Sequence, residues 1–198
     1  MSSYDVIGDI HGEAGKLEAL LKHLGYTALG KGYKAPQGRQ AVFLGDLIDP
    51  GPGQIRVLEI FRDMVDSGNS LCIMGNHEFN AIGFVVDDPL NPSEALRPNR
   101  GDTQKCARHR EQHNAFLEQV GQNADQHRSW VDWFRTLPVF LDLGGIRVVH
   151  GCWDGESELS NDKLAWYPNK PNKCLIFGGN EVLPPLIRQV QVNQNNIN

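Results

Sequence analysis

Three short apolar runs, each ended by a glycine and then by an acidic, amide or imidazole side chain, constrain the fold of this chain most. The runs are "YDVIG" (4–8), "QAVFLG" (40–45) and "SLCIMG" (70–75), and each is typical of a buried strand. Segments with helical spacing of apolar residues separate them, at 12–26 and 53–68. Strands that alternate with helices at this spacing predict β-α-β units and a largely parallel sheet.

The remainder of the chain is less regular. Residues 86–108 are rich in proline, asparagine and charge, which predicts a long surface excursion that could serve as a lid. Residues 109–136 have a helical pattern, and 139–151 resemble a hairpin that turns at two glycines. Residues 152–198 have no assigned pattern and end in a polar tail near 189–198.

Composition favours a single soluble domain over residues 1–198, with 40% hydrophobic and 22% charged residues. A net charge of −5 argues against a broad basic face for nucleic acid. The sequence has neither a secretory signal pattern nor an apolar stretch near the roughly 20 residues that span a bilayer. Four cysteines without C-x-x-C spacing indicate reduced thiols, so we expect a cytoplasmic protein. The oligomeric state is not specified by the sequence.

The polar residues that follow the strands predict a metal site. They occur in "GDIHG" (8–12), "GDLIDPG" (45–51), "GNHE" (75–78) and "HG" (150–151). Because ligands collect at the carboxyl ends of parallel strands, these side chains should face one another. Carboxylates packed at one edge require a cation between them, and mixed Asp, His and Asn ligands suit Mn²⁺, Fe²⁺ or Zn²⁺, whereas Mg²⁺ prefers oxygen. Two metals about 3.5–4 Å apart are the usual arrangement for displacement at phosphorus.

These fragments, in this order and each after an apolar strand, resemble the calcineurin-like metallophosphoesterases. The resemblance covers residues 4–151 and is greatest to the branch of serine/threonine protein phosphatases and bacterial diadenosine-tetraphosphatase-like enzymes. It implies an α/β fold, a β-sandwich flanked by helices (αββα) and shortened at the C-terminus. It also implies two divalent metal ions, Mn²⁺ first, and hydrolysis of phosphoesters or phosphoanhydrides by a metal-bridging hydroxide.

The resemblance also implies a role for each motif residue. Asp9 and His11 would hold the first metal, Asp46 would bridge, and Asn76 and His150 would hold the second. His77 would protonate the leaving oxygen, oriented by Asp49, whose carboxylate would raise the imidazole pKa. Glu78 would tie down the turn, and Gly8, Gly45 and Gly75 would allow close backbone approach.

Three departures from the family pattern bear on activity. Pro50 and Met74 stand where phosphate-binding arginines occur in relatives, and Met74 favours the dinucleotide-hydrolase group over protein phosphatases. The sequence has no histidine after His150 to match a further family motif. We therefore expect a weaker second metal site and reduced activity.

Further candidates lie outside the motifs. Arg97 and Arg100 could supply phosphate contacts, and Trp153 could stack on a nucleobase or wall the pocket. His109 and His113, four residues apart in a charged segment, indicate a solvated helix face more than a metal site. The favoured substrate is a small phosphorylated metabolite or dinucleoside polyphosphate. The alternatives are a serine/threonine-type protein phosphatase and a non-catalytic metal-binding relative.

Overall fold

The computed structural model describes residues 3–120, 124–151, 175–177 and 187–190, and the elements below belong to this part of the chain. In chain order they are β1 (Ser3–Ile7), α1 (Ala14–His23), β2 (Thr27–Leu29), β3 (Gly32–Lys34), β4 (Arg39–Phe43), α2 (Gln54–Asp66), β5 (Ser70–Cys72), α3 (Asn76–Val85), β6 (Asp87–Asp88), β7 (Asn91–Ala95), α4 (Gln104–Gln112), α5 (Asn114–Val120), α6 (Ala124–Phe134), β8 (Phe140–Asp142), β9 (Arg147–Val149), β10 (Leu175–Phe177) and β11 (Ile187–Val190).

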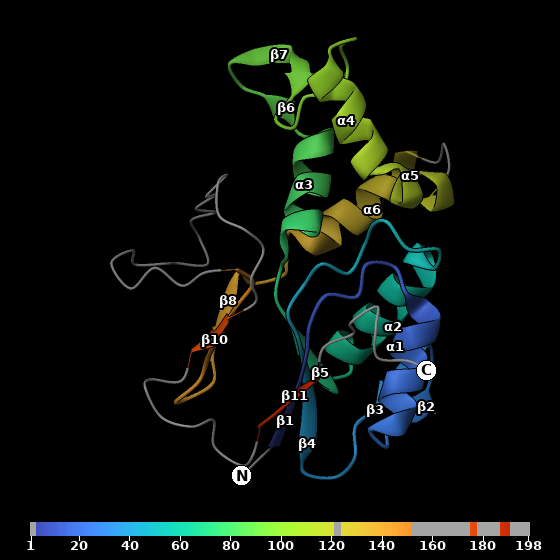
Figure 1. The fold of residues 1–198 in the computed structure, drawn as a ribbon, viewed down its shortest axis with the longest axis vertical. Helices are drawn as coiled ribbons and strands as arrows, with labels where there is room; N and C mark the ends of the chain where they lie inside the picture. Colours follow the sequence, from blue (N-terminus) through green and yellow to red (C-terminus); the bar gives the residue numbers. More distant parts are fainter. Residues whose placement is uncertain (1–2, 121–123, 152–174, 178–186, 191–198) are drawn as a thin grey trace.

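A parallel sheet with strand order β11-β1-β4-β5 forms the centre of the fold (Figure 1). All neighbouring pairs in it are parallel, and α1 and α2 lie in the connections between β1, β4 and β5. The predicted β-α-β arrangement is therefore confirmed. Ile7 lies opposite Phe43, and Phe43 lies opposite Cys72, so the three strands end level with one another. This register brings the segments that follow the strands to one edge of the sheet.

Helices α1 and α2 cover one face of this sheet. Leu17 and Leu21 of α1 are fully buried, and the ring of Phe61 in α2 packs edge-on against that of Phe43 with centroids 4.1 Å apart. The fully buried apolar residues of α2 are Val57, Leu58, Ile60, Phe61 and Met64. Each large apolar side chain buried in this way contributes roughly 1.5–3 kcal/mol, so this core holds the strand ends in place.

A smaller antiparallel sheet, β10-β9-β8, covers the other face. A second apolar cluster joins the two sheets and consists of Val6, Val42, Leu44, Ile73 and Val148. Gly144 and Gly145, which both have positive φ, lie in the turn between β8 and β9. The predicted hairpin is confirmed, and the described residues form three of the four predicted layers: helices, parallel sheet and antiparallel sheet.

The segment from α3 to α6 extends beyond the carboxyl edge of the parallel sheet, toward the upper end of Figure 1. Residues 86–108, predicted as a surface excursion, include the β6–β7 hairpin and the start of α4. The carboxylate of Glu94 organises the turn after β7, because its Oε1 accepts the N–H groups of Ala95, Asn99 and Arg100 at 2.9–3.0 Å. The surface position is confirmed, and a lid function stays a prediction.

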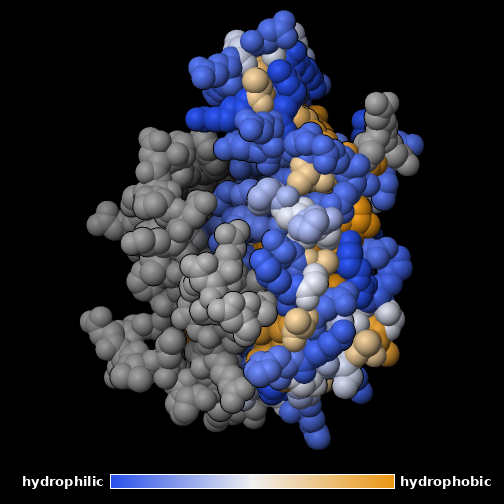
Figure 2. Space-filling view, turned by 45° about the vertical axis from the view of Figure 1, so that its right-hand side comes forward, coloured by the Kyte–Doolittle hydropathy of each residue, from blue (hydrophilic) through white to orange (hydrophobic). Residues whose placement is uncertain are grey.

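The surface is polar over much of the helical side. The face shown in Figure 2 is mostly hydrophilic, and its apolar residues are scattered among polar ones. Within the described ranges, each helix is too short or too polar to cross a lipid bilayer.

Candidate metal centre

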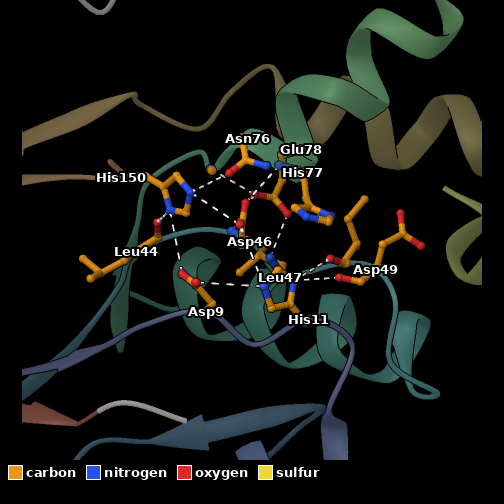
Figure 3. Close-up of polar contacts among 12 residues, drawn as sticks. Asp9, His11, Leu44, Asp46, Leu47, Asp49, Asn76, His77, Glu78 and His150 are labelled. Carbon is orange, nitrogen blue, oxygen red and sulfur yellow. Dashed lines mark hydrogen bonds and ion pairs between the residues drawn. The ribbon is translucent and has the colours of Figure 1, made fainter. Parts of the chain in front are cut away.

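Four segments bring polar side chains together at the carboxyl edge of the parallel sheet (Figure 3). They are Asp9 and His11 after β1, Asp46 after β4, Asn76 and His77 at the start of α3, and His150 after β9. Because β1, β4 and β5 end level with one another, the side chains that follow these strands lie close together. The packing of the antiparallel sheet on the parallel sheet brings His150 to the same edge.

Asp46 lies at the centre of the cluster, and its side chain is fully buried. Its Oδ1 accepts the backbone N–H of His77 at 2.9 Å. Its Oδ2 is buried and accepts no hydrogen bond from the described residues. The Nε2 atoms of His150 and His11 lie 3.4 and 4.0 Å from this oxygen. A buried carboxylate oxygen without a donor is costly unless a cation binds it.

Backbone carbonyls fix the orientation of two imidazoles of the cluster. Nδ1 of His11 donates to the carbonyl oxygen of Asp49 at 2.6 Å, and Nδ1 of His150 donates to that of Leu44 at 2.8 Å. Each ring therefore turns its Nε2 toward the cluster. Metal-binding histidines are held in this way in proteins, with one nitrogen on a carbonyl and the other free to coordinate.

Around His150, three acceptor atoms converge. Its Nδ1 carries a proton, so Nε2 offers a lone pair unless a second proton is bound, and it lies 3.0 Å from Oδ1 of Asn76 and 3.4 Å from Oδ2 of Asp46. Lone pairs at these distances repel one another unless a cation, either a proton or a metal ion, lies between them. As metal ligands, an imidazole nitrogen with an amide and a carboxylate oxygen suit a borderline divalent ion.

The possible ligand atoms form two overlapping groups. One contains His11, Asp46 and His77, the other contains Asp9, Asp46 and His150, and within each group the atoms lie within 4.8 Å of one another. Asp46 belongs to both, as expected of a carboxylate that bridges two ions.

Asp9 lies near both His11 and His150, and its predicted pairing with His11 on one ion stays a prediction. Asp9 lies 3.9 Å from Nε2 of His11 and 4.0 Å from Nδ1 of His150, so it lies between the two groups.

Burial and neighbouring charges set the protonation of the central residues. Burial raises the pKa of Asp46, but the interactions with His150 and His77 outweigh it, so this pKa lies below its usual range. Burial lowers the pKa of His77, against the opposing charge of Asp46. At neutral pH this leaves an ionised Asp46 beside a neutral His77. We expected a carboxylate to raise the pKa of His77, and desolvation reverses that direction.

The backbone is strained at this site. Among the described residues, the non-glycine residues with positive φ are His11 (51°), Asp46 (51°) and Asp49 (47°). Left-handed backbone costs roughly 1–3 kcal/mol per non-glycine residue and persists where the surrounding structure enforces it. Its concentration in two motifs is typical of a functional site.

Two of the three motif glycines are required for close approach. A side chain at Gly45, which has positive φ, would clash with the backbone of Gly75, and a side chain at Gly75 would clash with Asp46. The prediction is wrong for Gly8, where a side chain would meet open space.

Residues 3–193 match the sequence profile of a known family, calcineurin-like phosphoesterase. The chain belongs to the calcineurin-like phosphoesterase family. The resemblance predicted from the motifs is therefore confirmed. Calcineurin-like phosphoesterases bind divalent metal ions, in agreement with the donors gathered around Asp46.

The chain is similar to two curated bacterial proteins that are named asymmetrical bis(5'-nucleosyl)-tetraphosphatase PrpE. The protein from Oceanobacillus iheyensis is 28% identical over 145 residues, which cover 73% of this chain and 53% of the relative. The protein from Bacillus subtilis is 28% identical over 178 residues, covering 89% and 66%. A solved structure of a protein serine/threonine phosphatase from Saccharomyces cerevisiae gives a TM-score of 0.49 at 18% identity, covering 87% of this chain and 49% of that chain. The chain thus spans about half to two thirds of the lengths of these proteins.

The predicted pairing of the Asp49 carboxylate with the His77 imidazole is wrong, because other groups bind this carboxylate. Oδ2 of Asp49 accepts from Nδ1 of His113 at 2.7 Å, and Oδ1 accepts the N–H of Phe116 at 2.8 Å. Both oxygens are therefore used by the α4–α5 junction. The ring of His77 instead lies edge-on to that of His11, with centroids 4.8 Å apart.

The predicted substrate residues lie outside the cluster or outside the described residues. The guanidinium of Arg97 donates to Asn80 and Gln112 at 2.6 and 2.7 Å, and Arg100 forms an ion pair with Asp87 at 2.6 Å. Asn80 is one helical turn beyond Asn76, so Arg97 binds α3 about 6 Å along its axis from the cluster. Trp153 lies outside the described residues, and all three substrate roles stay predictions.

The expectation that His109 and His113 lie on a solvated helix face is also wrong. His109 and His113 are 8% and 5% exposed. His109 donates from Nδ1 to the carbonyl oxygen of Pro98 at 2.8 Å, and His113 contacts the rings of Phe84 and Phe116. His113 is the residue that sequence reasoning missed, because its partner Asp49 is 64 positions away.

Glu78 ties down the turn, as predicted. It is fully buried, and its carboxylate accepts the N–H groups of Asp46, Leu47 and Gly75 at 2.8–2.9 Å. Burial and the charge of Asp46 raise the pKa of Glu78 to about 7, although the N–H groups oppose the shift. Glu78 thereby joins the loop after β4 to the start of α3 and holds Asp46 near Gly75.

Replacing Glu78 with methionine should destabilise the protein strongly. Methionine has a similar length but leaves three buried N–H groups without an acceptor, at about 1–3 kcal/mol each. We expect the free energy of unfolding of metal-free protein, measured in urea, to fall by at least about 3 kcal/mol. The exposed Glu111→Met control should change it by less than about 0.5 kcal/mol. Equal effects of both substitutions would contradict the assigned role.

Proposed function

We propose that this protein is a metal-dependent hydrolase of phosphoester or phosphoanhydride bonds in small phosphorylated substrates, with dinucleoside polyphosphates as the favoured class. The observation that carries the proposal is the buried Oδ2 of Asp46, which faces two imidazoles and accepts no hydrogen bond from the described residues. The names of the two bacterial relatives, which are tetraphosphatases for bis-nucleosyl substrates, support the substrate class.

The candidate ligand atoms favour two divalent metal ions, with Mn²⁺ first and Fe²⁺, Zn²⁺ or Mg²⁺ as alternatives. Asp46 would be a ligand common to both ions, and His11, Asp9, Asn76 and His150 would be the further ligands. When bound, the ions would supply positive charge against the phosphate and lower the pKa of water.

Hydrolysis requires a new bond from water oxygen to phosphorus, cleavage of the bond from phosphorus to the leaving oxygen, and a proton for that oxygen. His77 is the proposed proton donor and acts in its protonated form, which is the minor form at neutral pH because burial lowers its pKa. Its backbone N–H is bound by Asp46 and its ring lies against His11, so its position relative to the cluster is fixed without Asp49. Pro50 and Met74 offer no charge to the phosphate. Arg97, which donates to Asn80 one turn along α3 from Asn76, is the proposed replacement.

Metal removal and substrate choice test the proposal together. We expect purified protein with Mn²⁺ to hydrolyse diadenosine tetraphosphate, to lose turnover completely in EDTA, and to regain it on addition of excess Mn²⁺. Product formation by chromatography is the measurement, and a phosphoserine peptide is the comparison substrate. Faster turnover of the peptide would favour a protein phosphatase. Tight Mn²⁺ binding without turnover of either substrate would favour a non-catalytic relative and overturn the proposal.

A further inference from the structure

His113 connects the end of helix α4 to the motif that follows β4, "GDLIDPG" (45–51). It lies between α4 and α5, is 5% exposed, and donates from Nδ1 to Oδ2 of Asp49 at 2.7 Å. The other carboxylate oxygen of Asp49 accepts the N–H of Phe116 at 2.8 Å. A carboxylate held by two donors from one junction cannot rotate without breaking both bonds.

Asp49 in turn determines the orientation of His11. Its carbonyl oxygen accepts Nδ1 of His11 at 2.6 Å, and its N–H donates to Oε1 of Gln54 at 2.8 Å. The residue has a left-handed backbone with φ of 47°, which other contacts must enforce. The bonds from His113 and Phe116 to its side chain are two such contacts.

We propose that His113 is a positioning residue of the metal centre. By holding the carboxylate of Asp49, it fixes the left-handed backbone whose carbonyl orients His11, and thereby directs Nε2 of His11 toward Oδ2 of Asp46. The inference rests on the proposed metal centre, and it assigns to α4 a role that the strand-end motifs do not contain.

A packing role is the competing explanation, because the ring centroid of His113 lies 4.9 and 5.2 Å from those of Phe84 and Phe116. Any aromatic ring of similar size would serve for packing, whereas only a donor at the Nδ1 position would hold Asp49. The two roles are therefore separable by substitution.

Mn²⁺ titration of metal-depleted full chain, without substrate, is the test. We expect His113→Phe, which keeps a ring and loses the donor, to weaken one of the two Mn²⁺ sites by about tenfold, the lower end for groups that support a ligand indirectly. The other site should keep its affinity. His113→Asn, whose amide nitrogen can take the place of Nδ1, should restore wild-type binding.

His109→Phe is the matched control. His109 lies in the last turn of α4, just before His113, is similarly buried, and donates from Nδ1 to a backbone carbonyl, but it has no link to Asp49. It should leave both Mn²⁺ sites unchanged. Wild-type affinities in His113→Phe, or equal weakening by His109→Phe, would overturn the proposal.

A second comparison applies if His113→Phe lacks a cooperative unfolding transition. The amide nitrogen of glutamine reaches the Nε2 position instead of Nδ1, so His113→Gln should bind Mn²⁺ weakly where His113→Asn binds normally. Equal binding by both would overturn the positioning role. Because binding is measured without substrate, wild-type protein that binds Mn²⁺ but hydrolyses nothing would count against the proposed function alone.

Discussion

Asp46→Asn should weaken the binding of both metal ions and reduce hydrolysis by about three orders of magnitude. Asparagine preserves the size of the side chain and the oxygen that accepts the N–H of His77, but it replaces Oδ2 with an NH₂ group and removes the charge. Since Oδ2 is common to both groups of ligand atoms, both sites lose an anionic ligand. The loss of charge stabilisation, roughly 4 kcal/mol, corresponds to the expected fall in rate.

Metal content by mass spectrometry and turnover of diadenosine tetraphosphate are the two measurements for Asp46→Asn. The control is Asp66→Asn, the same chemical change at an exposed position near the end of α2, which should retain both metals and wild-type turnover. A cooperative unfolding transition excludes misfolding as the cause. Retention of two Mn²⁺ ions by Asp46→Asn would remove the basis for a shared carboxylate.

The strands and the members of the cluster could be predicted from sequence because both depend on local patterns. An apolar run ended by glycine predicts a buried strand, and parallel strands bring their following residues to one edge. Asp9, Asp46 and Asn76 lie together for that reason. The partners of individual atoms depend on side-chain directions, which no periodicity specifies. The pairing of Asp49 with His77 was wrong for this reason.

His113 shows where a sequence signal was present but weak. The segment "ARHREQHNAF" is strongly polar, which favours a solvated helix. His113, Phe116 and Val120, however, have the spacing i, i+3, i+7 of one helical face, and all three are buried. That face could have placed His113 toward the core. Its contact with Asp49 still requires the tertiary packing of α5 on α2.

His77→Asn should slow hydrolysis in proportion to the need of the leaving group for a proton. The alkoxide leaving group of glycerol phosphate requires protonation, so we expect a loss of about 10²–10⁴-fold, the range for a general acid. The p-nitrophenolate leaving group departs without a proton, so turnover of p-nitrophenyl phosphate should fall far less. Steady-state rates with the two substrates give the ratio, and His23→Asn, an exposed histidine of α1, is the control.

The same variant distinguishes an acid from a ligand. His77 lies in one group of possible ligand atoms with His11 and Asp46, so its imidazole could instead bind a metal ion. If it donates a proton, His77→Asn keeps two Mn²⁺ ions and loses activity selectively with glycerol phosphate. If it is a ligand, the variant binds Mn²⁺ more weakly and loses activity with both substrates to the same extent. That second result would contradict the proton-donor role, and Asp46, His11 and Asp9 would then share the metal centre with a third imidazole.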